Sequence, residues 1–225
     1  MRKNRIWGIV NEDGNWTKEE EDVKIMFYNY YASLFTITNP SQAQLEVVLQ
    51  NMPRKVTDEM NEELDIPFIV EEISAALSQM CPIKAPEPDG VPVAFFQKHW
   101  KSVSKGVLPT YLHILNEGGN IASLNHTYIA LIPKVEKPRN VIEFRAISLC
   151  NVIYRIIVKT IANKLKYMLH DIISQTQSTF IPNKLITDNV VIGYECLHKI
   201  RLSRGRKNGL VALKLDISKA YDRIE

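Results

Sequence analysis

The chain has 225 residues, of which 45% are hydrophobic and 24% charged, and these proportions exclude a wholly disordered protein. Lys or Arg interrupts every apolar run before it reaches the roughly 18–20 residues of a membrane-spanning helix, so we expect no membrane partner. The N-terminal segment is positively charged with no apolar run behind it, so we expect no signal peptide. With no targeting signal, the expected location is nuclear or cytoplasmic. The three cysteines are far apart and odd in number, which predicts neither a disulfide nor a metal site: Cys81, Cys150 and Cys196.

Charge divides the chain into two unequal parts. Residues 1–89 contain 8 Lys and Arg against 16 Asp and Glu, a net charge of −8. Residues 90–225 contain the other 20 Lys and Arg against 9 Asp and Glu, a net charge of +11. A basic part of this size is typical of proteins that bind nucleic acid or another polyanion. A solvated surface whose two parts offset each other explains the same numbers.

The first 83 residues predict a helical connector. Thr17 stands before an amphipathic run with Glu20 three residues later, which is the pattern of a capping box. Prolines break up the segment that follows, so we expect little regular structure there. The expected elements are a helix at 17–35, a loose segment at 36–68 with one short helix near 41–51, and an amphipathic helix at 70–81.

Residues 84–225 predict alternating helices and strands. Prolines at 82–92 require a loop. Apolar residues at helical spacing predict helices farther on, and short runs rich in Ile, Leu and Val predict strands. The expected elements are two helices within 93–117 divided near Ser102–Ser104, a strand at 127–133, a strand in EFRAISLCN at 143–151, helices at 152–171 and 186–202, and a strand at 210–216.

The strand at 210–216 ends in an acid. Alternation places Val211, Leu213 and Leu215 on one face, and Lys214 and Asp216 on the other. A carboxylate at the end of an apolar strand can hold a metal ion beside a cleft. Taken alone, an Asp in this position is more commonly a helix cap.

Two cations frame a predicted hairpin. Lys134 follows the first arm, and Arg145 lies within the second, with the polar turn VEKPRNVIE between them. Arg offers a bidentate fork and Lys a point charge, which together suit a triphosphate. Two ordinary surface cations would give the same pattern.

Four segments occur in a fixed order and carry a family resemblance. They are KAPEPDGVPVAFFQKHW at 84–100, LIPKVEKPRNVIEFRAISLCNVIYRIIVKTIANKL at 131–165, QSTFIPNKLITDNVVIGYE at 177–195 and LVALKLDISKAYDRIE at 210–225. Together they closely resemble the reverse transcriptase of plant non-LTR (LINE-type) retrotransposons. The resemblance implies an α+β protein, a partial right-hand polymerase with fingers and the start of the palm, preceded by a helical connector. Its domains would be residues 1–83 and 84–225.

The resemblance also implies a chemistry and its residues. Reverse transcriptases perform two-metal nucleotidyl transfer with Mg²⁺, and their partners are an RNA template, a DNA primer and dNTP. Asp216 matches the first catalytic aspartate, a metal ligand, and the Ile217 carbonyl would support the second ion. Tyr221 matches the bulky residue that rejects a ribose 2′-hydroxyl, and Lys134 and Arg145 match the cations that clamp the triphosphate. The residues expected to face the backbone of template or primer, or else solvent, are Arg155, Lys159 and Lys164.

The sequence also departs from the family. No Asp-Asp pair occurs in it, although the family places its remaining catalytic aspartates in a Tyr-Ala-Asp-Asp type motif farther along. Glu87 and Ala146 stand where the family usually has Gly and Pro. We therefore expect a truncated polymerase fragment that is inactive alone, and whether the chain is itself an enzyme stays open. The alternative is a non-catalytic nucleic-acid-binding remnant that uses the basic face of residues 90–225.

Overall fold

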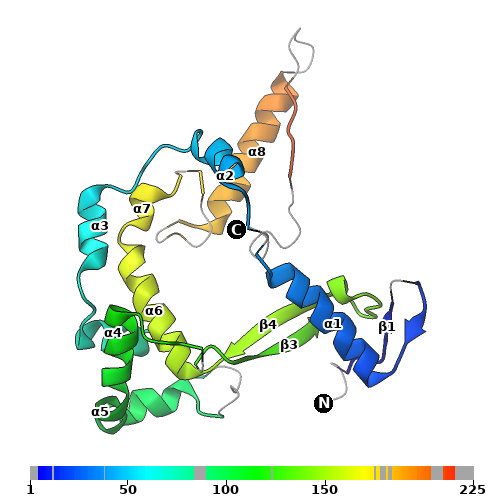
Figure 1. Ribbon diagram of the computed structural model, residues 1–225. Coiled ribbons are helices and arrows are strands. Elements are labelled where there is room, and N and C mark those ends of the chain that lie inside the picture. Colours follow the sequence, from blue (N-terminus) through cyan, green and yellow to red (C-terminus); the bar gives the residue numbers. More distant parts are fainter. Residues whose placement is uncertain are drawn as a thin grey trace. The chain divides into compact units, whose positions relative to one another are not determined.

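The structure is a computed structural model that describes residues 5–11, 13–37, 39–83, 90–122, 124–174, 176–177, 181, 184–203 and 210–215 (Figure 1). Contacts between residues divide the chain into two units. The first comprises Met1–Asn39 and Pro67–Ala162, and the second comprises Pro40–Ile66 and Asn163–Ile224. Each unit is described by itself below.

The described residues form a mixed structure of helices and short antiparallel sheets, as predicted. The sheets are two-stranded, and each is a hairpin of consecutive strands. In chain order the elements are β1 Ile9–Val10, β2 Trp16–Thr17, α1 Glu20–Phe35, α2 Gln42–Leu49, α3 Asp58–Asp65, α4 Val70–Ser78, α5 Val93–Glu117, β3 Thr127–Pro133, the 3-10 helix η1 Val141–Glu143, β4 Phe144–Cys150, α6 Val152–Lys166, α7 Leu169–Ile172 and α8 Ile186–Leu202.

The first helix begins later than its sequence pattern predicts. Thr17 belongs to β2, where it pairs with Ile9, and the helix begins only at Glu20, so Thr17 lies two residues before the capping position. The predicted cap is therefore wrong, and Glu19 precedes the first turn without a side-chain capping bond. Acidic residues fill that turn and favour the positive end of the helix dipole: Glu20, Glu21 and Asp22.

A buried aromatic cluster joins α1 to the β3–β4 hairpin. Val23, Phe27 and Tyr31 recur every four residues and bury one face of α1. They pack with Ile9 and Phe144, and the rings of Phe27 and Phe144 meet edge to face with centroids 5.2 Å apart. The predicted connector and the predicted polymerase segment therefore share a core. The boundary between residues 83 and 84 stays a prediction.

The hairpin of β3 and β4 is confirmed, and its register is regular. Thr127 pairs with Cys150 and Pro133 with Phe144, with every residue between them matched. Because side chains alternate, Leu131, Ala146 and Phe144 turn toward the aromatic cluster. The opposite face, which we call the open face, carries exposed residues: Tyr128, Ile132, Arg145 and Ile147.

A second core gathers α4, α5 and the start of α6. Its buried residues are Ile73, Leu77, Val93, Phe96, Tyr111, Val152, Ile156 and Ile157. The helix predicted at 70–81 is confirmed as α4. The two helices predicted within 93–117 are confirmed and are joined in α5 by a kink, but the division lies at His99 (φ −108°, ψ 16°) rather than near Ser102–Ser104. Serine weakens a helix only slightly, and the packing of Val103 and Val107 against the core offsets that cost.

Side-chain amides tie α5 to the segment before it. Gln97 Nε2 donates to the carbonyls of Leu77 and Met80, each at 2.9 Å, at the end of α4. Asn116 Oδ1 accepts from the amide of Phe68 at 2.7 Å, and its Nδ2 donates to the Phe68 carbonyl at 3.1 Å. These bonds satisfy backbone groups at both ends of α4 and fix its position on α5.

The helix predicted at 152–171 is divided and only partly buried. Asn151 caps α6, because its Oδ1 accepts from the amide of Tyr154 at 2.7 Å. α6 ends at Lys166, and the short α7 follows after a turn. Ile156 and Ile157 are buried, but Ile161 and Leu165 are 39% and 42% exposed, so the predicted apolar stripe continues past its packing partners.

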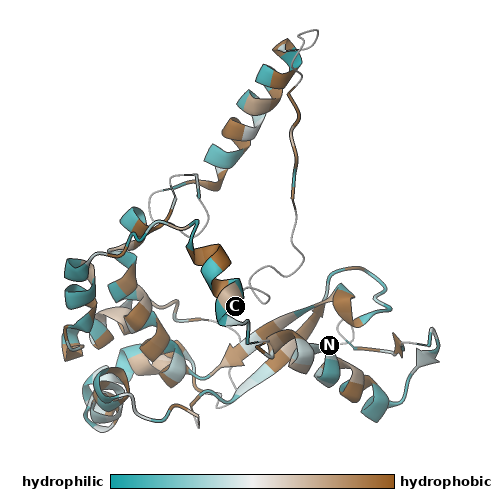
Figure 2. Ribbon diagram, turned by 45° about the horizontal axis from the view of Figure 1, so that its top comes forward, coloured by the Kyte–Doolittle hydropathy of each residue, from teal (hydrophilic) through white to brown (hydrophobic). Residues whose placement is uncertain are grey.

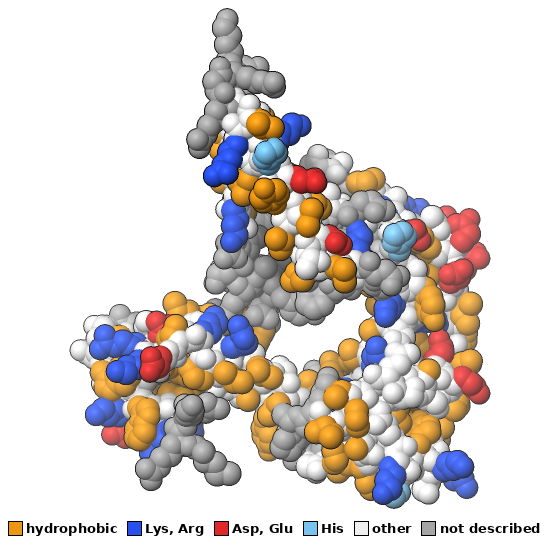
Figure 3. All heavy atoms as spheres, turned by 180° about the vertical axis from the view of Figure 1, so that it is seen from behind, with side chains coloured by type: hydrophobic (Ala, Val, Ile, Leu, Met, Phe, Trp, Pro, Cys, Tyr) orange, Lys and Arg blue, Asp and Glu red, His pale blue; other side chains and the backbone are white. Residues whose placement is uncertain are grey.

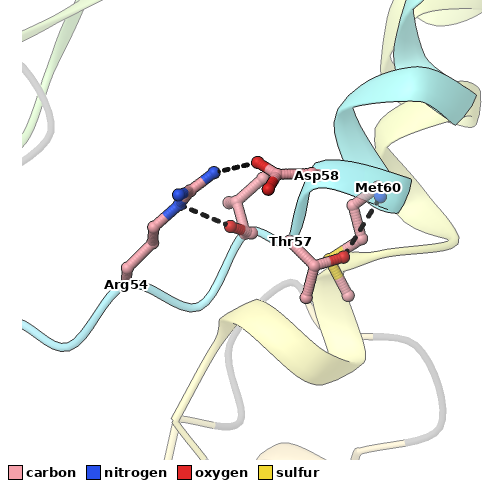
Figure 4. A network of polar contacts seen from close by, with 5 residues as sticks. Arg54, Thr57, Asp58 and Met60 are labelled. Atoms are coloured by element: carbon pink, nitrogen blue, oxygen red, sulfur yellow. Dashed lines mark hydrogen bonds and ion pairs between the residues drawn. The ribbon is translucent and has the colours of Figure 1, made fainter.

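Residues Pro40–Ile66 of the second unit contain one predicted helix and one that the sequence pattern missed. α2 confirms the helix near 41–51, with Ser41 as its capping residue. α3 was missed because it has few apolar residues. Its signal is the cap, where Thr57 Oγ1 accepts from the amide of Met60 at 3.2 Å beside an ion pair between Arg54 and Asp58 (Figure 4).

The largest difference between prediction and structure lies at the end of the described chain. α8 matches its prediction, but all of its residues are at least partly exposed, and apolar and polar turns alternate along it (Figure 2). The predicted strand at 210–216 does not form within 210–215. Val211, Leu213 and Leu215 are 91%, 80% and 78% exposed. A strand requires a partner strand for its hydrogen bonds, and no described residue supplies one.

Replacing Gln97 with Met should lower the free energy of unfolding by about 1–2 kcal/mol, because two carbonyls lose their donor while the side-chain volume is kept. Urea unfolding measures this difference. Lys98→Met, at an exposed position one residue on, is the matched control. Equal losses in the two variants would contradict the role of Gln97.

Replacing Tyr111 with Phe should leave stability unchanged or raise it by up to about 2 kcal/mol. The Tyr111 hydroxyl is buried without a hydrogen-bond partner among the described residues, and burial raises the pKa of Tyr111 well above its usual range. Tyr128→Phe, which removes an exposed hydroxyl, is the control for thermal unfolding. A clear loss of stability in Tyr111→Phe alone would show that the hydroxyl is bonded.

Candidate functional site

The β3–β4 hairpin places its two predicted cations on one face. Arg145 pairs with Ile132 across the ladder. Lys134 follows Ile132 by two residues, and its amide donates to the Glu143 carbonyl at 2.7 Å, so the ladder continues to this position. Side-chain alternation then puts Lys134 on the open face with Arg145, as diagonal neighbours roughly 7–8 Å apart. The predicted pairing of the two arms is therefore confirmed, and the binding of a triphosphate by the two cations stays a prediction.

The two cations differ in how firmly they are held. Lys134 Nζ donates to the carbonyl of Ile142 at 2.9 Å, which fixes the ammonium group near the turn and leaves it two further N–H donors. Arg145 is exposed, and its guanidinium has no hydrogen bond or ion pair with a described residue. One cation is thus positioned and the other is free to form a bidentate contact.

Glu143 holds the turn between the two arms. Its carboxylate accepts from the amides of Arg139 at 2.6 Å and Asn140 at 3.1 Å. These backbone bonds lower the pKa of Glu143, with a smaller contribution from the Arg139 charge. The sequence analysis did not single out Glu143. Its signal is Asn140 followed three residues later by a Glu, which is a capping pattern.

Lys134 and Arg145 carry the positive charge of the open face, and the carboxylate of the neighbouring Glu143 is engaged by the amides of Arg139 and Asn140. Neither Lys134 nor Arg145 forms an ion pair with an acidic residue in the described part of the chain. Ile132 and Ile147 lie between and beside them and are 39% and 38% exposed. Such a surface can bind phosphate oxygens through the cations and an apolar or planar group beside them.

The three cations of α6 do not share one face. Arg155 and Lys159 are one turn apart, whereas Lys164 lies nine residues from Arg155, about 180° around the helix. Lys164 Nζ donates to the carbonyl of Ile66. The Nε and Nη2 atoms of Arg155 are buried. Contact of these residues with nucleic acid stays a prediction.

Asp216, Ile217 and Tyr221 lie outside the described residues, as does Glu87, so their predicted roles have no structural test. Within the described ranges, no three His, Cys, Asp or Glu side chains gather as a metal site would require. Cys81, Cys150 and Cys196 are free. No described helix combines the length and the apolar character needed to cross a membrane.

Comparison with known proteins supports the interpretation of the motifs. Residues 132–225 match the family model described as reverse transcriptase (RNA-dependent DNA polymerase). The chain is also 28% identical over 223 residues to the uncharacterized 149 kDa protein of transposon TX1 from Xenopus laevis. That similarity covers 99% of this chain and spans 17% of the relative's length. Lys134, Arg145 and Asp216 all fall within the residues that match the reverse transcriptase family, and a transposon protein is a relative of nearly the whole chain.

Proposed function

We propose that this chain supplies the fingers and the start of the palm of an RNA-directed DNA polymerase from a LINE-type retrotransposon of the plant kind. The observation that carries the proposal is the open face of the β3–β4 hairpin, where Lys134 and Arg145 lie together within the residues that match the reverse transcriptase family. The substrates are an RNA template, a DNA primer and dNTP.

The geometry of the two hairpin cations supports the roles proposed for them. The free guanidinium of Arg145 binds two oxygens of one phosphate group, and Lys134 donates to a neighbouring phosphate while its bond to the Ile142 carbonyl holds it in place. Both charges offset the negative charge of the triphosphate and orient its reacting phosphorus. In the same proposal, Tyr221 excludes a ribose 2′-hydroxyl, and Arg155, Lys159 and Lys164 contact the backbone of template or primer.

Mg²⁺ is the proposed metal, and Asp216 with the Ile217 carbonyl would form part of its site. Mg²⁺ requires near-octahedral oxygen coordination, and the matched motif contributes one carboxylate and one carbonyl. That donor set does not fit two Mg²⁺ ions, so we derive no catalytic step through the metal.

Replacing Arg145 with Ala should weaken binding of a dNTP roughly 10- to 100-fold, because a charged hydrogen-bonding group is lost from the phosphate site. Lys134→Ala should weaken dNTP binding less, because a Lys ammonium acts on the phosphate as a point charge and does not form a bidentate contact. Isothermal titration with dATP measures both. Lys105→Ala, which removes an exposed cation of α5, is the control. An equal loss of dATP affinity in this variant would show that the hairpin cations act only as ordinary surface charges.

A polypeptide of these 225 residues should bind a primer–template duplex in a salt-dependent way without extending the primer. The reason is that these residues contain no Asp-Asp pair of the kind that the family uses beside its first catalytic aspartate. Primer extension with labelled dNTP and Mg²⁺ tests this expectation. Incorporation that disappears in Asp216→Ala would contradict it, and binding that is indifferent to salt would contradict the nucleic-acid partner.

A further inference from the structure

A concave surface lies at the hairpin turn, and neither Lys134 nor Arg145 is among the residues that line it. It has a volume of about 610 Å³ and is lined by Trp16, Lys137, Pro138 and Arg139. The proposed function assigns no role to any of these residues. An aromatic ring with two cations and no acidic side chain in the lining is the combination that binds single-stranded nucleic acid, because bases stack on the ring and phosphates meet the cations.

The indole of Trp16 is held in place by the chain beneath it. Gly8 lies directly under the ring, and a Cβ at Gly8 would stand 2.8 Å from Trp16 Cε2 and 2.4 Å from the Thr17 carbonyl oxygen. Gly8 also has φ +156°, a value that residues with side chains rarely adopt. The ring is still 42% exposed, so it presents a fixed surface to solvent.

The cationic wall is tied to the same frame. The amide of Val10 in β1 donates to the Arg139 carbonyl at 2.8 Å, which joins the N-terminal hairpin to the β3–β4 turn. Glu143 accepts from the Arg139 amide, so its carboxylate engages the backbone and leaves the Arg139 side chain without an ion pair in the described part of the chain. The concavity is therefore built from two anchored walls.

Charge at this end of the first unit is mixed, because Lys137 and Arg139 line the concavity whereas acidic residues fill the first turn of α1. Figure 3 shows Lys and Arg side chains in that part of the molecule together with apolar and acidic ones. Arg5 lies over the ring of Trp7, 4.7 Å from its centroid, which adds a third cation near the N-terminal hairpin. The hollow is open to solvent, so a base could reach the exposed ring of Trp16 directly.

We propose that Trp16, Lys137 and Arg139 form a binding site for single-stranded nucleic acid, in which a base stacks on Trp16 and the flanking phosphates contact the two cations. The choice of ligand rests on the proposed function, whereas the site rests on its own geometry. Its residues differ from Lys134 and Arg145, so the strand and the incoming nucleotide would be bound by different side chains.

The test uses the whole chain and a short single-stranded oligouridylate, with affinity measured by fluorescence anisotropy. Trp16→Leu should weaken binding roughly 5- to 150-fold, the usual range for loss of one stacked base, and Trp16→Phe should restore most of it. Trp7→Leu is the matched control and should change affinity little. Circular dichroism confirms that each variant is folded.

Two cation variants keep the test decisive if Trp16→Leu does not fold. Lys137→Ala and Arg139→Ala lie in an exposed turn, and each should reduce the slope of log affinity against log salt by about 0.7. Unchanged slopes in both variants would overturn the proposal. So would an oligoglutamate peptide that binds as tightly as the oligouridylate, because that result requires charge without stacking.

The same variants separate this site from the proposed polymerase function. Trp16→Leu should leave dATP binding intact, and Arg145→Ala should leave oligouridylate binding intact. If the chain does not bind dATP but binds the oligonucleotide in a Trp16-dependent way, only the proposed phosphate site at Lys134 and Arg145 is contradicted. If the chain binds dATP in an Arg145-dependent way but its binding of the oligonucleotide does not depend on Trp16, only the proposed stacking site is contradicted.

Discussion

The burial of Phe144 against α1 determines how the rest of the hairpin can be used. Its ring meets Phe27 edge to face and is 2% exposed, so this side of β4 must face the aromatic cluster. Because strand residues alternate, Arg145 is then forced to the opposite side, and the ladder places Lys134 with it. A one-residue slip in register would bury a guanidinium and expose a phenyl ring, which costs several kcal/mol in both respects. Packing on one face therefore fixes the electrostatics of the other.

Local patterns predicted the elements whose stability is largely local. β3, α4 and α8 match their predicted positions closely, since strand composition or helical periodicity was strong and a proline or a cap marked their ends. Thr17 does not cap α1 because it pairs with Ile9 of β1, and no pattern within the helix reveals that pairing. The strand predicted at 210–216 does not form within 210–215, although its local pattern is strong. Its alternation is clear, but a strand forms only when another strand pairs with it.

The candidate site was predictable to the level of residue type and face, and less so in detail. A hairpin with one cation on each arm follows from the sequence, and helical geometry alone separates Lys164 from Arg155. Two details depend on the conformation of the turn and could not be predicted. They are the bond from Lys134 to the Ile142 carbonyl and the bonds that the Glu143 carboxylate accepts from two turn amides. The concavity at Trp16 was not predicted, because Gly8, Trp16 and Lys137 are brought together by the contact between β1 and the distant turn.

Stability and binding are divided between different side chains of the same strands. The buried face of the hairpin contributes apolar contacts, whereas Lys134 and Arg145 contribute little to packing because both are exposed. Exposed ion pairs and cations change folding free energy by only about 0–1 kcal/mol, so variants at these positions report on ligands rather than on unfolding. The same reasoning holds for Lys137 and Arg139, which are exposed in an anchored turn. Trp16 differs, because its ring also packs on Gly8, and only the conservative Phe variant separates its two roles.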